Sequence, residues 1–305
     1  MGAIISAKNL VKKYGDFTAV DGISFEIPEG ECFGFLGPNG AGKTSTVKMI
    51  HCVSPVTGGA LSVAGLAAHI DNRAVKKMTG VIPQEITLDI DLTVRENLMV
   101  FSKFFDIPRR EAAGRIDELL KFVELESKRD QKIDQLSTGM KRRLLIARAL
   151  LNQPKIIIAD EPTTGLDPQA RHLIWQRLRL LKSRGATLIL TTQYMEEASQ
   201  LCDRIVIMHN GKILKEGAPL RLIEEEIGRE VAEIRISQDQ DARLIALLEG
   251  STWGHERAGD TLFFYSRDGQ GLRRKLMELD LPNAMHRPAT LEDVFLKLTG
   301  RSLVE

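Results

Sequence analysis

The fold of this chain is decided by a stretch that reads Gly37-Pro38-Asn39-Gly40-Ala41-Gly42-Lys43-Thr44-Ser45. The stretch satisfies the pattern G-x-x-x-x-G-K-[ST] of a phosphate-binding loop. The mostly apolar residues 31–36 before it predict a short buried strand, and residues 44–50 after it predict the first turns of a helix. Because strand, loop and helix follow one another in the order that such a loop requires, we expect a cradle for nucleotide phosphates here.

The residue types in this loop suit that task. Glycine lets successive backbone N–H groups converge on phosphate oxygens, and the N-terminus of the following helix adds a partial positive charge. Lys43 can reach the terminal phosphates, and the Thr44 hydroxyl can ligate Mg²⁺. We therefore expect residues 37–45 to bind ATP together with Mg²⁺.

Length and composition limit the choice of function. The chain has 305 residues, which leaves room for about two domains. Its formal net charge is +1 with 43% hydrophobic residues, so no basic face for nucleic acid is expected. Cys32, Cys52 and Cys202 lack C-x-x-C spacing, which argues against a disulfide framework and a zinc site and favours small buried side chains.

A membrane span is not expected either. No run approaches the roughly 18 uninterrupted apolar residues needed to cross a bilayer, and the N-terminus lacks the basic-then-apolar pattern of an export signal. We expect a soluble cytosolic chain whose membrane role, if it has one, depends on another polypeptide.

The N-terminal region predicts an antiparallel layer. Three short β-like pieces, 3–7, 17–20 and 23–27, precede the loop, and residues 57–65 resemble a hairpin return. Tyr14 lies 23 residues ahead of Gly37, where an aromatic ring could stack on adenine. The alternative is an ordinary half-exposed tyrosine on a strand.

Gln84 comes at the carboxyl end of a short apolar strand, 79–84. Ligands bind at the carboxyl ends of strands in an open α/β sheet, so an amide there is a candidate binding group. Its alternative interpretation is a plain surface residue.

Residues 92–149 change to a helical pattern, and we expect a helical subdomain at about 88–152. It includes a capping-box spacing at 93–96 and closes with Leu136-Ser137-Thr138-Gly139-Met140. Ser137 is placed to cap the next helix, whose N-terminal N–H groups form a second candidate anion site.

The predicted strand 155–160 is continuously apolar from 156 to 159, as expected for a parallel strand covered on both faces, and this apolar run is followed by Asp160 and Glu161. The first carboxylate can hold Mg²⁺, and the second can orient and deprotonate an attacking water, as phosphoryl transfer requires. Asp167 followed by proline predicts a helix start, and the strand 186–192 leads to Gln193.

The fold class follows from the alternation of strands and helices between 30 and 208. It predicts an α/β P-loop nucleotide-binding cassette with a mostly parallel sheet, an antiparallel β layer and a helical insertion over residues 1–228. Residues 229–305 predict a small accessory α+β domain, with strands at 231–236 and 262–265 and helices at 241–249, 272–279 and 290–298. This second domain is either a regulatory or interaction module or simply packing.

Together, these motifs resemble the nucleotide-binding subunits of ATP-binding cassette (ABC) transporters. The likeness rests on the phosphate loop, Gln84, Gln193 and the segments 136–140, 156–161 and 165–167. The segments 92–98, 167–175 and 291–300 narrow it to the ABC-2 exporter group and to the NodI-like ATPases of nodulation-factor exporters. It covers nearly the whole chain.

The resemblance implies a homodimer in which each ATP lies between the phosphate loop of one subunit and the 137–139 signature of the other. Closure on ATP would drive separate transmembrane permease subunits from the cytoplasmic face of the inner membrane, for export of a lipo-oligosaccharide or drug-like amphiphile. It further implies that Tyr14 stacks on adenine, Gln84 senses Mg²⁺ and the membrane subunit, Asp160 supports Mg²⁺, Glu161 is the base and Asp167 couples the two sites.

Two motifs, the signature and the switch, depart from the family pattern. Thr138 stands where the signature commonly has its first glycine, and Met140 where it has glutamine. Gln193 occupies the switch position that histidine usually holds. Its amide can hydrogen-bond the γ-phosphate but cannot titrate near neutral pH, so we expect hydrolysis without imidazole-type pH dependence.

The main alternative is a non-transport ATP switch of the same superfamily. A translation-type switch would carry two cassettes, and a chromosome-maintenance type would need a long heptad insertion between the phosphate loop and the signature. The sequence has neither feature. A small-molecule kinase would leave residues 136–140 unexplained.

Overall fold

The computed structural model describes residues 2–68, 70–235, 254–266, 269–278 and 284–300. The chain forms two compact units, Met1–Lys215 and Glu216–Glu305. The expected domain boundary after residue 228 falls inside the second unit.

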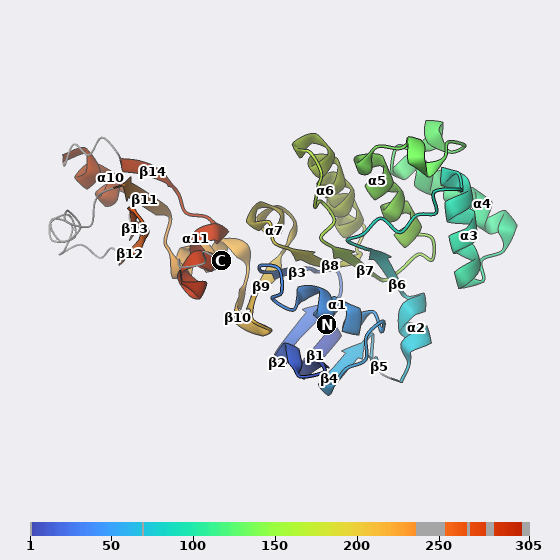
Figure 1. Cartoon of the computed structure of the whole chain (residues 1–305), viewed down its shortest axis with the longest axis horizontal. Helices are drawn as coiled ribbons and strands as arrows, with labels where there is room; N and C mark the ends of the chain where they lie inside the picture. Colours follow the sequence, from blue (N-terminus) through green and yellow to red (C-terminus); the bar gives the residue numbers. More distant parts are fainter. Residues whose placement is uncertain (1, 69, 236–253, 267–268, 279–283, 301–305) are drawn as a thin grey trace. The chain divides into compact units, whose positions relative to one another are not determined.

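The first unit is built on a six-stranded sheet with the order β10-β9-β3-β8-β7-β6, as Figure 1 shows. The strands are β3 (Cys32–Leu36), β6 (Thr79–Ile82), β7 (Ile156–Asp160), β8 (Thr187–Thr192), β9 (Arg204–His209) and β10 (Lys212–Gly217). The pairs from β9 through β3, β8 and β7 to β6 are all parallel. Every residue of β3, β7 and β8 is buried, because the sheet is covered on both faces. The predicted parallel core is confirmed.

A second sheet of the first unit has the order β2-β1-β4-β5. Its strands are β1 (Ala3–Tyr14), β2 (Phe17–Pro28), β4 (Gly58–Val63) and β5 (Leu66–Ala67). The antiparallel layer is confirmed, but the division into three short pieces before the loop is wrong. Two long strands run through, and β1 bulges near Asn9, whose φ is 46°. The bulge interrupts the alternation that marks a strand in sequence.

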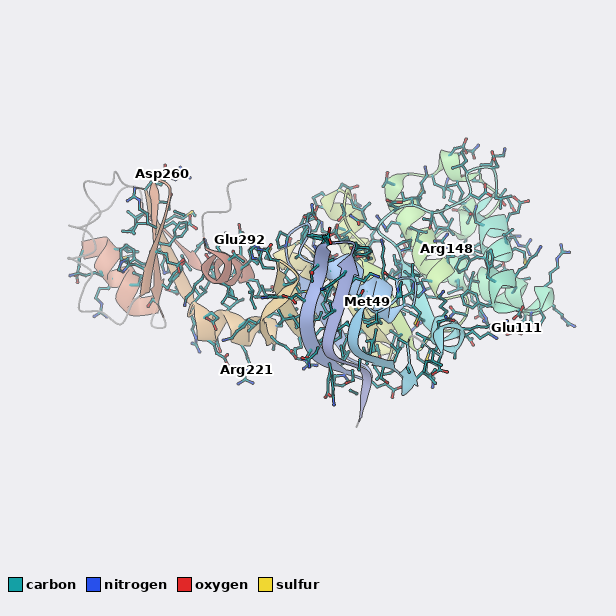
Figure 2. All side chains as sticks on the ribbon, turned by 60° about the horizontal axis from the view of Figure 1, so that its bottom comes forward. Met49, Glu111, Arg148, Arg221, Asp260 and Glu292 are labelled. Atoms are coloured by element: carbon teal, nitrogen blue, oxygen red, sulfur yellow. The ribbon has the colours of Figure 1, made fainter. Side chains whose placement is uncertain are left out.

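Helix α1 (Lys43–Ile50) contacts strands of both sheets. Its residues Val47, Met49 and Ile50 belong to the hydrophobic core that joins the sheets. Figure 2 shows Met49 beside the strands of the antiparallel layer. This packing holds the phosphate loop, which leads directly into α1, on a rigid base.

The remaining helices of the first unit are α2 (Asn72–Lys77), α3 (Val94–Ser102), α4 (Arg109–Phe122), α5 (Thr138–Ala149), α6 (Pro168–Ser183) and α7 (Met195–Leu201). Helices α3, α4 and α5 contact one another and form the green group in Figure 1. The capping box at Thr93 and Glu96 is present, and Ser137 and Asp167 cap α5 and α6 as predicted. The helical insertion is therefore confirmed in its elements.

The second unit contains α8 (Pro219–Glu226), β11 (Glu230–Arg235), β12 (Gly254–Ala258), β13 (Thr261–Ser266), α10 (Gly269–Glu278), β14 (Ala284–Pro288) and α11 (Leu291–Thr299). Its four strands are antiparallel in the order β12-β13-β11-β14. Residues of α10 pack on the sheet around Ile234 and Phe264. The sequence did not predict β12 and β14, whose polar residues lack apolar alternation, and the helix expected at 241–249 lies outside the described residues.

Candidate functional site

The phosphate loop follows β3 and ends at the N-terminus of α1, as the sequence predicted. Gly42 has φ +100°, and a Cβ on it would lie 2.4 Å from the carbonyl oxygen of Ala19. Only glycine fits there without strain. Lys43 folds over the loop, since its Nζ donates to the carbonyl oxygens of Gly37 (2.9 Å) and Pro38 (3.0 Å).

A cavity of about 360 Å³ opens over this loop. Its lining comes from β1, β2, the loop, the end of β6 and the end of β7, and comprises Tyr14, Phe17, Ala19, Asn39, Gly40, Ala41, Gly42, Lys43, Thr44, Ser45, Gln84 and Glu161. The structure thus brings most of the predicted nucleotide-binding residues to one place.

Two exposed aromatic side chains are among the residues that line the cavity. Tyr14 is 48% exposed, and hydrogen bonds with Ser54 and Ser45 lower the pKa of its hydroxyl. Phe17 is 64% exposed and lies opposite Tyr14 in the β1–β2 pair. Phe17 was not predicted as a site residue, although an aromatic residue three positions after Tyr14, across the turn at Gly15, was a usable signal.

Asp160 lies at the end of β7 and is buried. Its Oδ1 accepts hydrogen bonds from the hydroxyls of Thr44 (3.2 Å) and Thr191. Thr191 comes from the neighbouring strand β8 and was not among the predicted site residues. The carboxylate and the Thr44 hydroxyl form a set of hard oxygen atoms of the kind that Mg²⁺ prefers.

Glu161 takes a left-handed backbone conformation, with φ +46°. Such a backbone is uncommon for a residue other than glycine and is held here by the surroundings, since the Glu161 N–H donates to the Thr191 carbonyl oxygen (3.0 Å). The carboxylate Oε2 accepts from Gln84 Nε2 (3.0 Å) and from Thr164 Oγ1 (3.2 Å). Glu161 is therefore fixed in backbone and side chain at the floor of the cavity.

The charges in this cavity are concentrated on a few buried groups. Lys43 is 4% exposed, and its Nζ lies 3.5 Å from Glu161 Oε1. Burial lowers the pKa of Lys43, while Glu161 and Asp160 oppose that shift. The ammonium is compensated by carboxylates from the end of β7, which keeps a cation at the place where phosphates would arrive.

The signature residues line a different pocket. Ser137 accepts a hydrogen bond from the Met140 N–H, and Asp167 accepts one from the Ala170 N–H (2.9 Å). Both side chains face a pocket of about 160 Å³, whose lining also includes Gly139. This pocket and the phosphate-loop cavity have no lining residue in common. Thr138 is the first residue of α5.

Gln193 follows β8 and is half-buried, but it is not among the residues that line the phosphate-loop cavity. It follows Thr192, the last residue of β8, so it lies at the carboxyl end of a strand of the parallel sheet, as Asp160 does.

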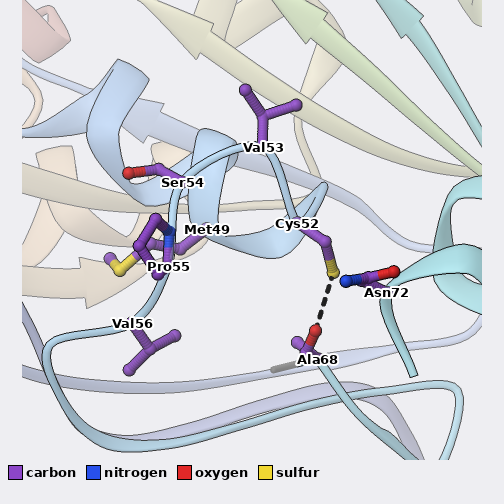
Figure 3. Close-up of a pocket in the computed structure, with 8 residues that line it drawn as sticks. All are labelled: Met49, Cys52, Val53, Ser54, Pro55, Val56, Ala68 and Asn72. Atoms are coloured by element: carbon purple, nitrogen blue, oxygen red, sulfur yellow. Dashed lines mark hydrogen bonds between the residues drawn. The ribbon is translucent and has the colours of Figure 1, made fainter. Parts of the chain in front are cut away.

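A third cavity, of about 250 Å³, lies beside α1 and contains none of the predicted site residues (Figure 3). Cys52 lines it and is half-buried, with its thiol donating to the Ala68 carbonyl oxygen at 3.1 Å. Burial raises the pKa of this thiol. Cys32 and Cys202 are buried as expected, whereas Cys52 lies at the edge of the core.

Three features together define an ATPase of the ABC class. They are a phosphate loop at a helix N-terminus, a strand that ends in two carboxylates and a capped signature helix. Comparisons with known proteins agree. Residues 20–164 match the family model described as ABC transporter, and residues 246–300 match that of the C-terminal domain of the nodulation factor export protein NodI.

Similar curated proteins include the Nod factor export ATP-binding protein I of Burkholderia orbicola, 48% identical over 99% of this chain and 98% of its own length. That of Rhizobium sp. strain N33 is 46% identical over 98% of both chains. Among solved structures, the dimeric cassette MJ0796 bound to ADP and Pi is 31% identical with a TM-score of 0.64, covering 70% of this chain and 98% of that one. The cassette cbiO1 from Clostridium perfringens is 27% identical with a TM-score of 0.68, covering 74% and 92%.

The chain therefore belongs to the ATP-binding subunits of ABC transporters, in the family of the Nod factor export ATP-binding proteins I. It binds nucleotide and hydrolyses ATP to drive transport. Within the described part of the chain, no helix is long and apolar enough to cross a membrane.

Proposed function

We propose that two copies of this chain bind two ATP molecules between them, each ATP held by the phosphate loop of one copy and by residues 137–139 of the other. The observation that carries the proposal is the separation of the two pockets. Ser137 and Asp167 present a capped helix end and a carboxylate in one pocket, while Lys43 and Glu161 lie in another. A nucleotide in the Lys43 cavity of one chain therefore needs a second copy to meet a signature.

In this arrangement the residues of the cavity have separate tasks. Lys43 and the N–H groups of residues 37–45 bind the phosphates, and Tyr14 stacks on adenine. Thr44, Asp160 and Gln84 would hold Mg²⁺, which neutralises charge that develops on the phosphate oxygens.

Glu161 acts as the general base on the attacking water. Its hydrogen bonds with Gln84 and Thr164 leave Oε1 as the oxygen that can accept a proton, and Lys43 lies 3.5 Å from it. Gln193 would bind the γ-phosphate from the end of β8, and Asp167 would link the two sites across the dimer.

We further propose that 1–228 is the ATPase domain, with a helical subdomain at about 88–152, and that 229–305 is a regulatory or interaction module. The ATPase would work at the cytoplasmic face of the inner membrane with separate transmembrane permease subunits, exporting a lipo-oligosaccharide or a drug-like amphiphile. The curated relatives named for Nod factor export support this substrate class.

The shared site can be tested without measuring turnover. Asn39 and Ser137 are both exposed, so Asn39→Cys and Ser137→Cys can be combined in a Cys52→Ser background and treated with a short bis-maleimide. We expect a cross-linked dimer that forms with ATP and much less without it. The single variants Asn39→Cys and Ser137→Cys are the controls. Equal cross-linking with and without ATP, or none at all, would contradict the proposal.

The transport role needs a separate test. The chain can be reconstituted in vesicles with the membrane protein of about six helices that we expect to be encoded beside it. We expect that protein to stimulate ATP hydrolysis and to move a labelled lipo-oligosaccharide, and both effects should stop with Glu161→Gln. Substrate movement that continues with this variant would reject coupling to hydrolysis.

A further inference from the structure

Helix α5 carries a buried arginine one turn after its capping serine. Arg142 is 3% exposed, and its guanidinium donates to the carbonyl oxygens of Pro83 and Gln84, the latter at 2.8 Å. These two carbonyls are successive in the chain and lie almost 60 residues earlier in the sequence. Arginine suits the position because its planar fork can reach both oxygens at once, whereas a lysine ammonium cannot match that geometry.

The same helix holds the rest of this segment. Arg148, labelled in Figure 2, donates to the carbonyl oxygen and the hydroxyl of Thr87 and stacks on the Phe101 ring, 4.8 Å from its centroid. Asn152, just past the end of α5, donates to the carbonyl oxygen of Lys77 at the end of α2 and to that of Thr79, the first residue of β6. Strand β6 and the segment 83–87 are therefore hydrogen-bonded to side chains of α5 and of the residues just after it.

The side chain of Gln84 extends to the floor of the phosphate-loop cavity, whereas its backbone carbonyl accepts from Arg142. Its amide donates to Glu161 Oε2 at 3.0 Å. A continuous path of bonds thus runs from Ser137 through α5 to Arg142, then to Gln84 and finally to the carboxylate of Glu161.

The charge of Arg142 has few partners in this place. Burial lowers its pKa, and the nearby buried carboxylate of Glu197 opposes that shift. Burying a guanidinium costs free energy that an apolar side chain of similar size would avoid. A role in packing alone would therefore not require an arginine here.

We propose that Arg142 is a positioning residue that couples the signature end of α5 to Glu161 through Gln84. This rests on the proposed dimer: when Ser137 of one chain meets the nucleotide of the other, the shift of α5 is transmitted by Arg142 to Gln84 and aligns the chain's own base. Binding in one site then promotes hydrolysis in the other.

The test uses the full-length chain with Arg142→Met, which removes both bonds, and Arg142→Lys, which keeps the charge. For both variants we expect kcat to fall about tenfold and the Hill coefficient for ATP to fall toward one, with KM and the Kd for ATP almost unchanged. If Arg142→Met does not fold, the kcat and Hill coefficient of Arg142→Lys test the proposal. Arg115→Lys is the matched control, because Arg115 on α4 donates to the Leu151 carbonyl oxygen and does not touch 83–87.

A double-variant cycle separates this role from general stability. If Arg142 acts through Gln84, then Gln84→Ala combined with Arg142→Met should have the same kcat as Gln84→Ala alone. Losses that multiply in the double variant would overturn the proposal, as would an unchanged kcat and Hill coefficient in Arg142→Lys. The ATP-dependent cross-link between residues 39 and 137 tests the dimer independently, so failure of the dimer and failure of the coupling give different results.

Discussion

Lys43 Nζ lies 3.5 Å from Glu161 Oε1 in the floor of the nucleotide cavity, and both side chains are buried. The residue that binds phosphates and the residue that serves as base therefore compensate each other's charge. Because Lys43 binds phosphates and Glu161 accepts a proton, substitutions at the two positions should have distinct effects.

Glu161→Gln should stop turnover while keeping ATP binding. The amide has almost the same shape and still accepts from Gln84 or Thr164, but it cannot take a proton from water. We expect kcat to fall about a hundredfold or more. Sedimentation with ATP should show the variant trapped as a dimer. Hydrolysis at the parent rate would reject Glu161 as the base.

Lys43→Ala should act on binding instead. It removes the buried cation and leaves the Glu161 carboxylate without its neighbour, so we expect the Kd for ATP to rise at least about tenfold, or 1.4 kcal/mol. Direct calorimetric titration measures this. An unchanged Kd would count against the phosphate cradle. Lys48→Ala, on an outward-facing position of α1, serves as the control.

The pH profile of hydrolysis should lack a titration of the imidazole type. Gln193 has no proton to lose near the free-histidine pKa of about 6.5. The half-buried His51 has its pKa lowered to about 4 by desolvation and by Lys76, so it titrates below this range. Gln193→His should introduce a step in kcat/KM near that pH. A step of the same kind in the unsubstituted chain would assign the switch to another residue.

Gly80→Ala should destabilise the first unit. A Cβ on Gly80 would lie 2.1 Å from the Ala149 carbonyl oxygen, so β6 and α5 would have to separate. We expect a loss of about 1–3 kcal/mol, seen as a lower thermal midpoint. Gly114→Ala in α4 has open space around its Cβ and should be neutral or stabilising. Equal midpoints for the two variants would contradict the close packing of α5 on β6.

Lowering the pH should destabilise helix α11 in the second unit. Burial opposes ionisation of Asp293, but hydrogen bonds from Arg287 and Thr290 prevail and its pKa lies below the ordinary value of 3.8. A carboxyl group whose pKa is lower in the folded than in the unfolded protein stabilises the fold at pH values above its unfolded-state pKa. That stabilisation is lost as the pH falls through the folded-state pKa.

Amide hydrogen exchange in α11 of the full chain, compared at roughly pH 5 and pH 3, measures this effect. Protection should fall with pH in the parent. In Asp293→Asn it should already be lower at the higher pH and should change less. Identical pH dependence in the two proteins would show that Asp293 does not control this helix.

The sequence by itself determined the local chemistry of the ATPase. The glycine pattern of the loop, the apolar run ending at Asp160 and Glu161, and the caps Ser137 and Asp167 depend on neighbours a few residues apart, so periodicity and turn rules identify them. The order of these motifs along the chain was enough to predict the parallel core and the class of the protein.

Only the tertiary structure decided which of these pieces meet. It shows that the Thr191 hydroxyl donates to Asp160 from the next strand. It also shows that Arg142 donates to carbonyl oxygens that are far away in sequence. It also placed Ser137 and Lys43 in different pockets. Contacts of this kind arise when strands pair and helices pack, and no local pattern of residues records which distant side chains those events bring together.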